Sequence, residues 1–246
     1  MHDKFEEIAQ FWTKIKRHTE TFFNWDNSVS YHQIASFIIG YFTGLEYITN
    51  IPYHCKFRYW FLVKYKWHPN VWWDCMIEDH CKKNEAKSIR MALREIEGFI
   101  LAEKTMVHEF TDTQFDITIL CSHETLQETT KKRYEQLTLK LSRFIIGPFA
   151  FTTGKFDQEK AYMSVFGYLF GLLYGMSHFS GVDYVEKFQR WLFVKHSISD
   201  VIPWPRLFTE RLSLEDKYRA ATMASEEILY FFKEEIRFDR PPDLTL

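Results

Sequence analysis

The sequence has little of what turns and sheets require. Its 246 residues include only nine glycines and seven prolines, two of the residues that dominate tight turns. A fold with many short strands needs turns at regular, short spacing. The composition therefore argues against a β-rich fold and favours a few long helices.

An excess of charge of one sign and long apolar runs are also missing. The chain carries 31 basic and 33 acidic side chains, a formal net charge of −2 at pH 7. Phosphate backbones bind to basic faces, so this balance gives no reason to expect a nucleic-acid partner. The most apolar stretch, residues 161–176, is shorter than the ~20 residues that span a bilayer. It predicts a buried helix and no membrane insertion.

Cysteines are few, and the first residues are polar. The four cysteines are irregularly spaced, and residues 1–4 lead directly into a charged amphipathic stretch, unlike the apolar segment of a secretory signal. We therefore expect a cytoplasmic protein with free thiols.

Established catalytic and cofactor motifs are absent from the sequence. It has no phosphate-binding loop, dinucleotide glycine fingerprint, zinc-protease helix, nucleophile elbow or paired-cysteine motif. One group of residues has the right types for zinc, but Cys75 and His80 are five apart, which does not suit one helix face. We interpret the group as ordinary thiols and surface histidines: His54, Cys55, Cys75, His80 and Cys81. The sequence thus predicts no catalytic residue, cofactor or metal.

Aromatic residues, by contrast, are abundant, and many of them recur in an internal repeat. They make up 18% of the chain, which predicts a core filled by rings. Phe-Ile-Ile-Gly-Tyr-Phe-Thr-Gly-Leu at 37–45 returns as Ser-Val-Phe-Gly-Tyr-Leu-Phe-Gly-Leu at 164–172. Phe-Arg-Tyr-Trp-Phe-Leu-Val-Lys at 57–64 returns as Phe-Gln-Arg-Trp-Leu-Phe-Val-Lys at 188–195. Later pairs in register are Trp73 with Trp204, Ala92 with Ala224, Glu95 with Glu227, Ile96 with Ile228 and Phe99 with Phe231.

The repeat divides the chain into two divergent copies of one multi-helix unit, residues 1–120 and 121–246. We predict an all-α fold in which the two tandem copies pack as a pseudo-two-fold helical bundle. Apolar residues at helical spacing predict helices at about 3–24, 29–48, 53–66, 71–81, 84–104, 124–146, 157–176, 182–196, 205–211 and 213–236. Residues 115–120 could form a short strand between the copies.

Glycines in the repeat lie four residues apart, so each set forms a bare stripe on one helix face. A glycine costs about 1 kcal/mol relative to alanine in a helix interior, and close approach of a neighbouring helix is the simplest reason to keep it. We also expect Trp60 and Trp191 in the core. The glycines concerned are Gly40, Gly44, Gly167, Gly171 and Gly175.

Tryptophans and acids meet in residues 66–79. Trp67 and Trp72 have no tryptophan counterpart in the second copy, so we predict that one of them is an exposed interface anchor. Adjacent carboxylates point about 100° apart on a helix, so Glu78 and Asp79 do not form a catalytic pair. An acidic patch here would instead steer a basic partner such as a nuclease. The predicted partner-binding residues are Trp67, Trp72, Glu78 and Asp79.

One spacing suggests an enzyme. Arg190 and His196 resemble the Arg-x5-His ribonuclease motif of helical HEPN domains. That family usually has a polar residue after the arginine, whereas this chain has Trp191, and the first copy has Tyr59 and Tyr65 at the corresponding places. A HEPN-like ribonuclease is therefore the alternative to a binding protein.

The repeated pattern also resembles small helical proteins encoded beside bacterial polymorphic or contact-dependent toxins. It runs Phe-x-x-Gly-Tyr-x-x-Gly-Leu, Phe-x-x-Trp-Leu, an aromatic segment and Ala-x-x-x-Ile-x-x-Phe, with Phe61 replacing the leucine in the first copy. The shared positions are packing positions, so no functional residue carries over. The resemblance implies a non-enzymatic immunity protein that binds a cognate protein toxin, such as a nuclease, in the cytoplasm and occludes its active site. A scaffold or assembly protein is a third reading.

Overall fold

The computed structural model describes residues 2–23, 29–49, 51–67, 71–105, 137, 139, 141, 158–199, 202–213 and 216–235. Within these ranges every regular element is helical, as the sequence predicts. The first half contains α1 (His2–Arg17), α2 (Thr19–Phe23), α3 (Tyr31–Thr49), α4 (Tyr53–Tyr65), α5 (Trp73–His80) and α6 (Glu85–Thr105). The second contains α9 (Gln158–Ser180), α10 (Tyr184–Lys195), α11 (Trp204–Leu207), the π-helical turn η1 (Phe208–Leu212) and α12 (Lys217–Glu235).

Most predicted helices are confirmed to within a turn. The first is divided by a bend at His18 into α1 and α2. The predicted strand at 115–120 lies outside the described residues. So does the helix at 124–146, except that residues 137, 139 and 141 are helical.

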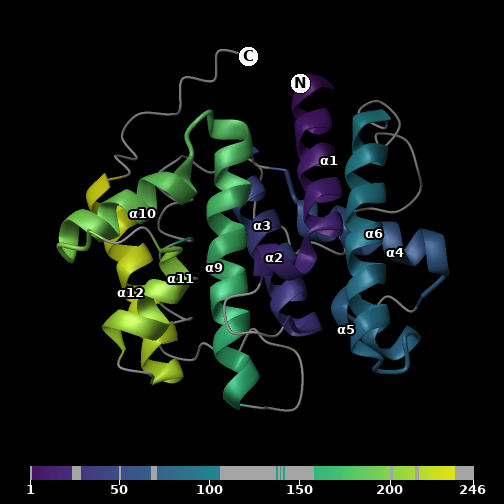
Figure 1. The fold of residues 1–246 in the computed structure, drawn as a ribbon. Coiled ribbons are helices and arrows are strands. Elements are labelled where there is room, and N and C mark those ends of the chain that lie inside the picture. Colours follow the sequence, from purple (N-terminus) through teal and green to yellow (C-terminus); the bar gives the residue numbers. More distant parts are fainter. Residues whose placement is uncertain are drawn as a thin grey trace.

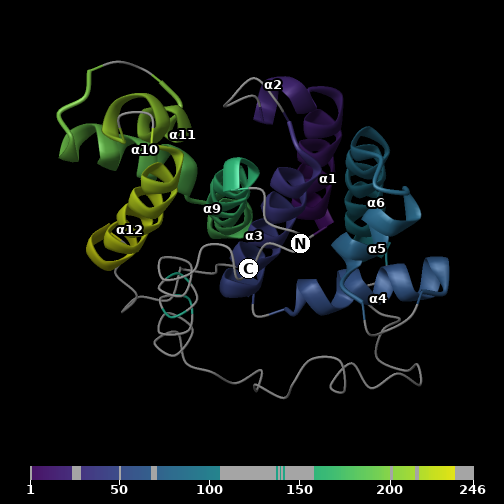
Figure 2. The same ribbon diagram turned by 90° about the horizontal axis from the view of Figure 1, so that it is seen from below.

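Helices α3 and α9 pack against each other through the middle of the molecule (Figures 1 and 2). Their glycines explain the close approach. A Cβ added at Gly40 would lie 1.9 Å from the carbonyl oxygen of Tyr168, and one added at Gly171 would lie 2.0 Å from that of Phe37. Gly44, Gly167 and Gly175 make similar approaches. The predicted close helix contact is confirmed, and it is reciprocal, because glycines of each helix meet the backbone of the other.

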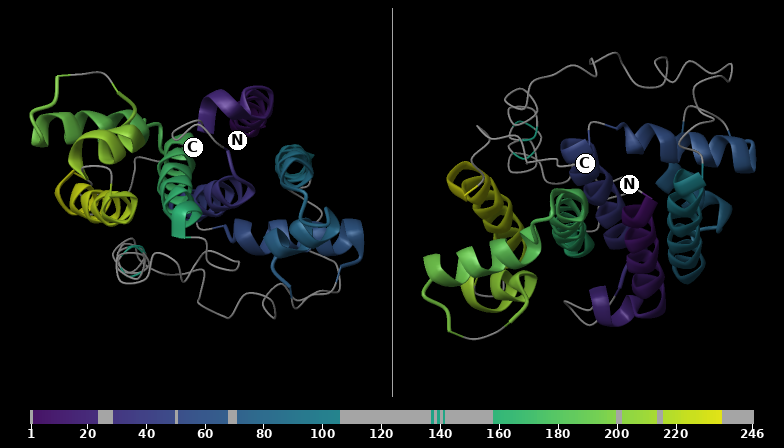
Figure 3. Two further views of the ribbon diagram at one scale, coloured as in Figure 1. Left: turned by 60° about the horizontal axis from the view of Figure 1, so that its bottom comes forward. Right: turned by 90° about the horizontal axis from the view of Figure 1, so that it is seen from above.

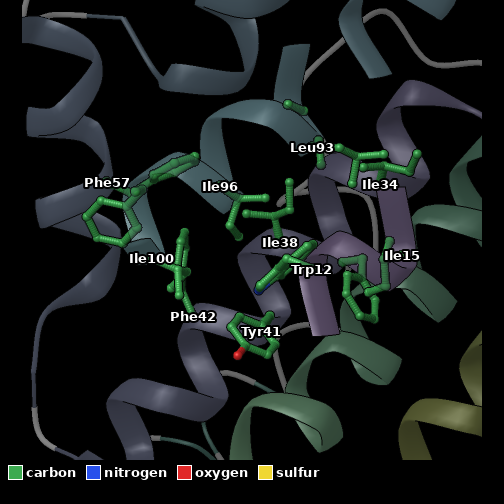
Figure 4. Close-up of a cluster of buried hydrophobic side chains, with 14 of the residues drawn as sticks. Trp12, Ile15, Ile34, Ile38, Tyr41, Phe42, Phe57, Leu93, Ile96 and Ile100 are labelled. Atoms are coloured by element: carbon green, nitrogen blue, oxygen red, sulfur yellow. The ribbon is translucent and has the colours of Figure 1, made fainter. Parts of the chain in front are cut away.

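The remaining helices lie on the two sides of this central pair (Figure 3). On one side α1, α4, α5 and α6 enclose an aromatic and aliphatic core with α3 (Figure 4). On the other, α10, α11, η1 and α12 enclose a second core with α9. Rings on α1 and α2 join the sides: Phe11 lies 5.0 Å from Tyr174, and Phe22 lies 5.6 Å from Phe170, between ring centroids.

The prediction that Trp60 and Trp191 lie in the core is wrong in the extent of their burial. Both are half-buried, whereas Trp12, Trp73 and Trp204 are fully buried. The ammonium group of a lysine lies over each half-buried ring, because Lys64 and Lys195 are one helical turn further on. Among the described helices, none combines the length and apolar character that crossing a bilayer requires.

Candidate functional site

Helices α4, α5 and α6 meet at one end of the molecule, where the predicted binding residues lie (Figure 1). Aromatic rings fix their arrangement: Phe57 of α4 lies 5.1 Å from Trp73 of α5 and 5.1 Å from Phe99 of α6, between centroids. All three rings are buried. The residues around them are therefore held on a rigid support, which a specific binding surface needs.

A buried carboxylate links α6 to the C-terminal end of α4. Glu95 is fully buried and accepts hydrogen bonds from Trp60 Nε1 (3.0 Å), Lys64 Nζ (2.6 Å), Tyr65 Oη (2.6 Å) and Arg94 Nε (2.9 Å). Burial by itself would raise the pKa of Glu95, but these donors outweigh it and hold the pKa below its usual value. Four donors occupy the carboxylate oxygens, so Glu95 is suited to fix α4 against α6.

The second half contains a similar arrangement at the aligned residues. Glu227 accepts from Lys195 Nζ (2.6 Å) and contacts His196 Nε2 (3.2 Å), in the positions of Lys64 and Tyr65. Lys195 lies over the ring of Trp191, 4.5 Å from its centroid, as Lys64 lies 5.0 Å from that of Trp60.

The two predicted tryptophans differ in their surroundings. Trp67 is half-buried and stacked on Tyr65, with centroids 4.6 Å apart, and on Phe61, 5.3 Å apart. Trp72 is 56% exposed, immediately before α5, and among the described residues the guanidinium of Arg58 lies over its ring, 5.5 Å from the centroid. Trp72 is thus the tryptophan that presents apolar area to solvent.

The two predicted acids lie near the other end of α5. Glu78 is half-buried, with an oxygen 3.7 Å from His32 Nε2 of α3, and Asp79 is exposed. Since Trp72 directly precedes α5 and the acids are six and seven residues further on, about 9–10 Å of helix separates them from Trp72. Trp67 lies at the same end of α5 as the two acids, because its ring is 5.5 Å from that of His80. The four predicted residues therefore border one helix without forming a single cluster.

The residues considered as metal ligands have other contacts. His54 Nε2 lies 3.2 Å from Thr43 Oγ1, and Cys81 Sγ lies 3.8 Å from Met91 Sδ. Among the described residues no three potential ligands come together. Cys75 and Cys81 are free thiols, as expected, but Cys55 is disulfide-bonded, so the expectation of free thiols is wrong there.

The residues of the ribonuclease alternative contact different carboxylates. Arg190 is exposed and pairs with Glu186 one turn earlier on α10, at 2.5 Å. His196, just after α10, contacts Glu227 of α12.

Sequence reasoning missed the basic residues around α5. Residues 51–94 contain nine basic and four acidic side chains, although the chain as a whole is slightly acidic. Seven of the basic residues are exposed and cluster at the ends of α4 and α5 and along α6: Lys64, Lys66, Lys82, Lys83, Lys87, Arg90 and Arg94. The regional charge count was the signal that could have found them.

Comparison with known proteins returns no family, no characterised protein and no solved structure that matches this chain. The function therefore has to be argued from the residues and their arrangement.

Proposed function

We propose that this chain is an immunity protein, which binds a cognate bacterial toxin and neutralises it by occluding the active site. The observation that carries the proposal is Trp72, a residue that is 56% exposed on a rigid, ring-packed support. Tryptophan is one of the three residue types that are enriched among the energetically dominant residues of protein interfaces. The aligned residue of the second half is Pro203, so the helices do not need a tryptophan there for packing. The resemblance of the repeated pattern to immunity proteins points the same way.

The proposed contact surface surrounds α5. Trp72 would enter an apolar pocket of the toxin at one end of the helix, and Trp67, Glu78 and Asp79 would form polar and aromatic contacts at the other. Because the surface extends along a short rigid helix, it suits a convex or flat partner whose active site it covers. The toxin's C-terminal catalytic domain, for instance a nuclease, is the proposed partner.

We further propose that the chain arose by tandem duplication and that its halves, 1–120 and 121–246, are related by a pseudo-two-fold axis between α3 and α9. The reciprocal glycine contacts support this. Aligned ring pairs support it too: Phe57 and Phe99 lie 5.1 Å apart at 60°, and Phe188 and Phe231 lie 5.2 Å apart at 59°.

The proposed location is the cytoplasm, where such toxins act. The disulfide of Cys55 stands against this location, because disulfides persist mainly in oxidising compartments. Thiol labelling in acid-quenched cells decides between them: labelled Cys55 supports the cytoplasm, and a protected Cys55 contradicts it.

The experiment for the function is inhibition of a toxin by the purified chain. Tagged chain is first used to capture its partner from the native host, and the partner's catalytic domain is then assayed alone. We expect stoichiometric inhibition by the wild-type chain. We also expect Trp72→Ala to weaken binding by about 2 kcal/mol or more without lowering Tm.

The matched control is Tyr218→Ala, which removes another exposed ring, at 54% exposure, from the far side of the molecule. It should inhibit like the wild type. Undiminished toxin activity in the presence of excess folded wild-type chain would refute the proposal.

A further inference from the structure

Five exposed basic residues lie around α5. Lys66, Lys82, Lys83, Lys87 and Arg90 are all exposed, and none of them forms an ion pair with a residue that the structure describes. On the other side of the molecule, Arg190, Lys195 and Arg206 pair with glutamates, whereas Arg219 and Lys233 of α12 form no ion pair with a described residue. Unpaired charges of one sign produce a local positive potential despite the net charge of −2.

Side-chain contacts bring these residues to one corner. Tyr65 and Trp67 flank Lys66, and their ring centroids lie 5.8 and 5.5 Å from that of His80 at the end of α5. The chain then turns, with Lys82 N and Lys83 N donating to the carbonyls of Asp79 and Glu78, and α6 begins at Glu85.

The positive surface continues along α6. Lys87, Arg90 and Arg94 are three and four residues apart and exposed, so they form one stripe on the outer face, about 10 Å long. Arg94 (62% side-chain exposure) and Lys64 (42%) share a single carboxylate, that of Glu95. Two cations facing one carboxylate leave one net positive charge at the end of the stripe.

The aligned positions of the second half lack this stripe. Where the first half has Lys66, Arg90 and Arg94, the second has Ser197, Thr222 and Glu226. The packing of these helices is thus compatible with neutral or acidic residues. The basic residues of the first half need a reason other than packing.

Three of the lysines also adopt a backbone conformation that favours glycine, and the first is Lys66, with φ of 54° just after α4. Lys82 and Lys83 have φ of 53° and 56° in the turn after α5, where an L-residue is strained and glycine is not. Lysine at both positions is unfavourable for folding, which indicates that the charges themselves are useful.

We propose that this corner, defined as Lys66, Lys82, Lys83, Lys87, Arg90 and Arg94, is the docking surface for an acidic segment of the partner protein. The spacing on α6 fits a helix with Asp or Glu at every third or fourth position. The inference rests on the proposed function in that the partner is a protein. It differs from the sequence prediction by assigning the steering charge to these cations and not to Glu78 and Asp79.

A protein fits this corner better than a single-stranded nucleic acid does. Nucleic-acid surfaces of this kind present free aromatic faces on which bases stack. Here Trp67 is stacked on Tyr65 and Phe61, and Trp72 is covered on one side by Arg58. Carboxylates at Glu78 and Asp79 would also oppose a continuous run of phosphates.

The test is fluorescence anisotropy with a labelled helical peptide that carries glutamates on one face, at low and physiological ionic strength. We expect binding that weakens with salt and a loss of about tenfold or more in K87E/R90E. The control R219E/K233E makes the same change in charge on α12, at two exposed residues, and should bind within about twofold of the wild type. A second variant, K82G/K83G, relieves the strained turn, so we expect weaker binding with an unchanged or higher Tm.

The proposal would be overturned if the acidic peptide did not bind at low salt, or if K87E/R90E and the α12 control lost binding equally. Tighter binding of an oligouridine probe than of the peptide, sensitive to K87E/R90E, would also overturn it and assign the corner to nucleic acid. The toxin assay separates this inference from the proposed function. If K87E/R90E inhibits the toxin as well as the wild type, the docking surface is refuted and the function stands. If the wild-type chain does not inhibit the toxin, the proposed function is refuted, whether or not the acidic peptide binds.

Discussion

At the scale of single residues, Glu95 shows how a buried charge is made compatible with a core of rings. An ionised carboxylate is costly to bury unless donors surround it, and here two aromatic donors and two cations do so. Because the cations are partly exposed, they add little desolvation of their own.

Replacing this carboxylate should therefore destabilise the protein. We expect Glu95→Gln to lower the free energy of unfolding by about 2–3 kcal/mol, because an amide cannot accept from four donors. Glu227→Gln, with two donors at the aligned position, should cost about 1 kcal/mol. Urea denaturation at pH 7 measures both. Equal costs would show that the extra donors of Glu95 contribute nothing.

His178 provides a pH dependence at the contact between the halves. Its Nδ1 lies 2.9 Å from Tyr41 Oη, and its ring lies 4.7 Å from that of Phe11. Burial lowers the pKa of His178 to about 4, and Lys4 acts in the same direction, while Glu7 and Asp183 oppose it. The folded state thus favours the neutral ring, and its contribution is complete above pH ~6.5.

As the pH falls from about 6.5 to 4, the unfolded chain binds a proton that the folded protein resists. The wild type should lose up to about 3 kcal/mol from this group. His178→Asn, which keeps a polar group near Tyr41, should lose less over the same interval, and the exposed-site control His18→Asn should follow the wild type. Urea titrations at several pH values provide the comparison, and identical slopes for all three proteins would exclude His178 as the cause.

At the scale of helices, the glycine stripes decide how closely α3 and α9 approach. We expect Gly171→Ala to cost about 3 kcal/mol or more, because its methyl group would meet the carbonyl oxygen of Phe37 at 2.0 Å. Backbone atoms cannot move aside as a flexible side chain does.

Gly98 is the matched control, since a Cβ there would meet only Trp60 Cζ2, at 3.6 Å. Gly98→Ala should stabilise the protein by about 0.5–1 kcal/mol. Thermal and urea unfolding of both variants measure the difference. Similar effects from the two substitutions would mean that the central helices can separate without loss.

Much of the helical structure and of its packing could be predicted from the sequence. Helical spacing identified the buried face of α1, with Ile8 and Trp12 fully buried, and the four-residue glycine spacing predicted the close helix contact. Trp60 was misjudged because an amphipathic pattern does not show whether a lysine one turn away will cover the ring. The cations of α6 were missed because the net charge of the whole chain averages over an uneven distribution.

At the scale of the whole molecule, the two sides contain aligned residues in similar contacts, such as Glu95 and Glu227, but present different surfaces. Trp72 and the corner of cations belong to the first half, and the aligned positions of the second half carry Pro203, Thr222 and Glu226. A shared framework with one distinctive face is what a specific binding protein requires. Site residues such as these could be predicted only in part, because surface positions are the least constrained by packing.

The central claim is that this molecule neutralises a toxin, and growth protection tests it most directly. A toxin domain identified beside the gene would be expressed in a susceptible bacterial strain with the wild-type chain, with Trp72→Ala or with neither, and survival would be measured. If the chain is an immunity protein, we expect full survival with the wild-type chain and reduced survival with Trp72→Ala at an equal protein level. Cells that express the toxin domain alone should die. Equal killing with and without the folded wild-type chain, or the absence of any neighbouring toxin gene, would contradict this claim.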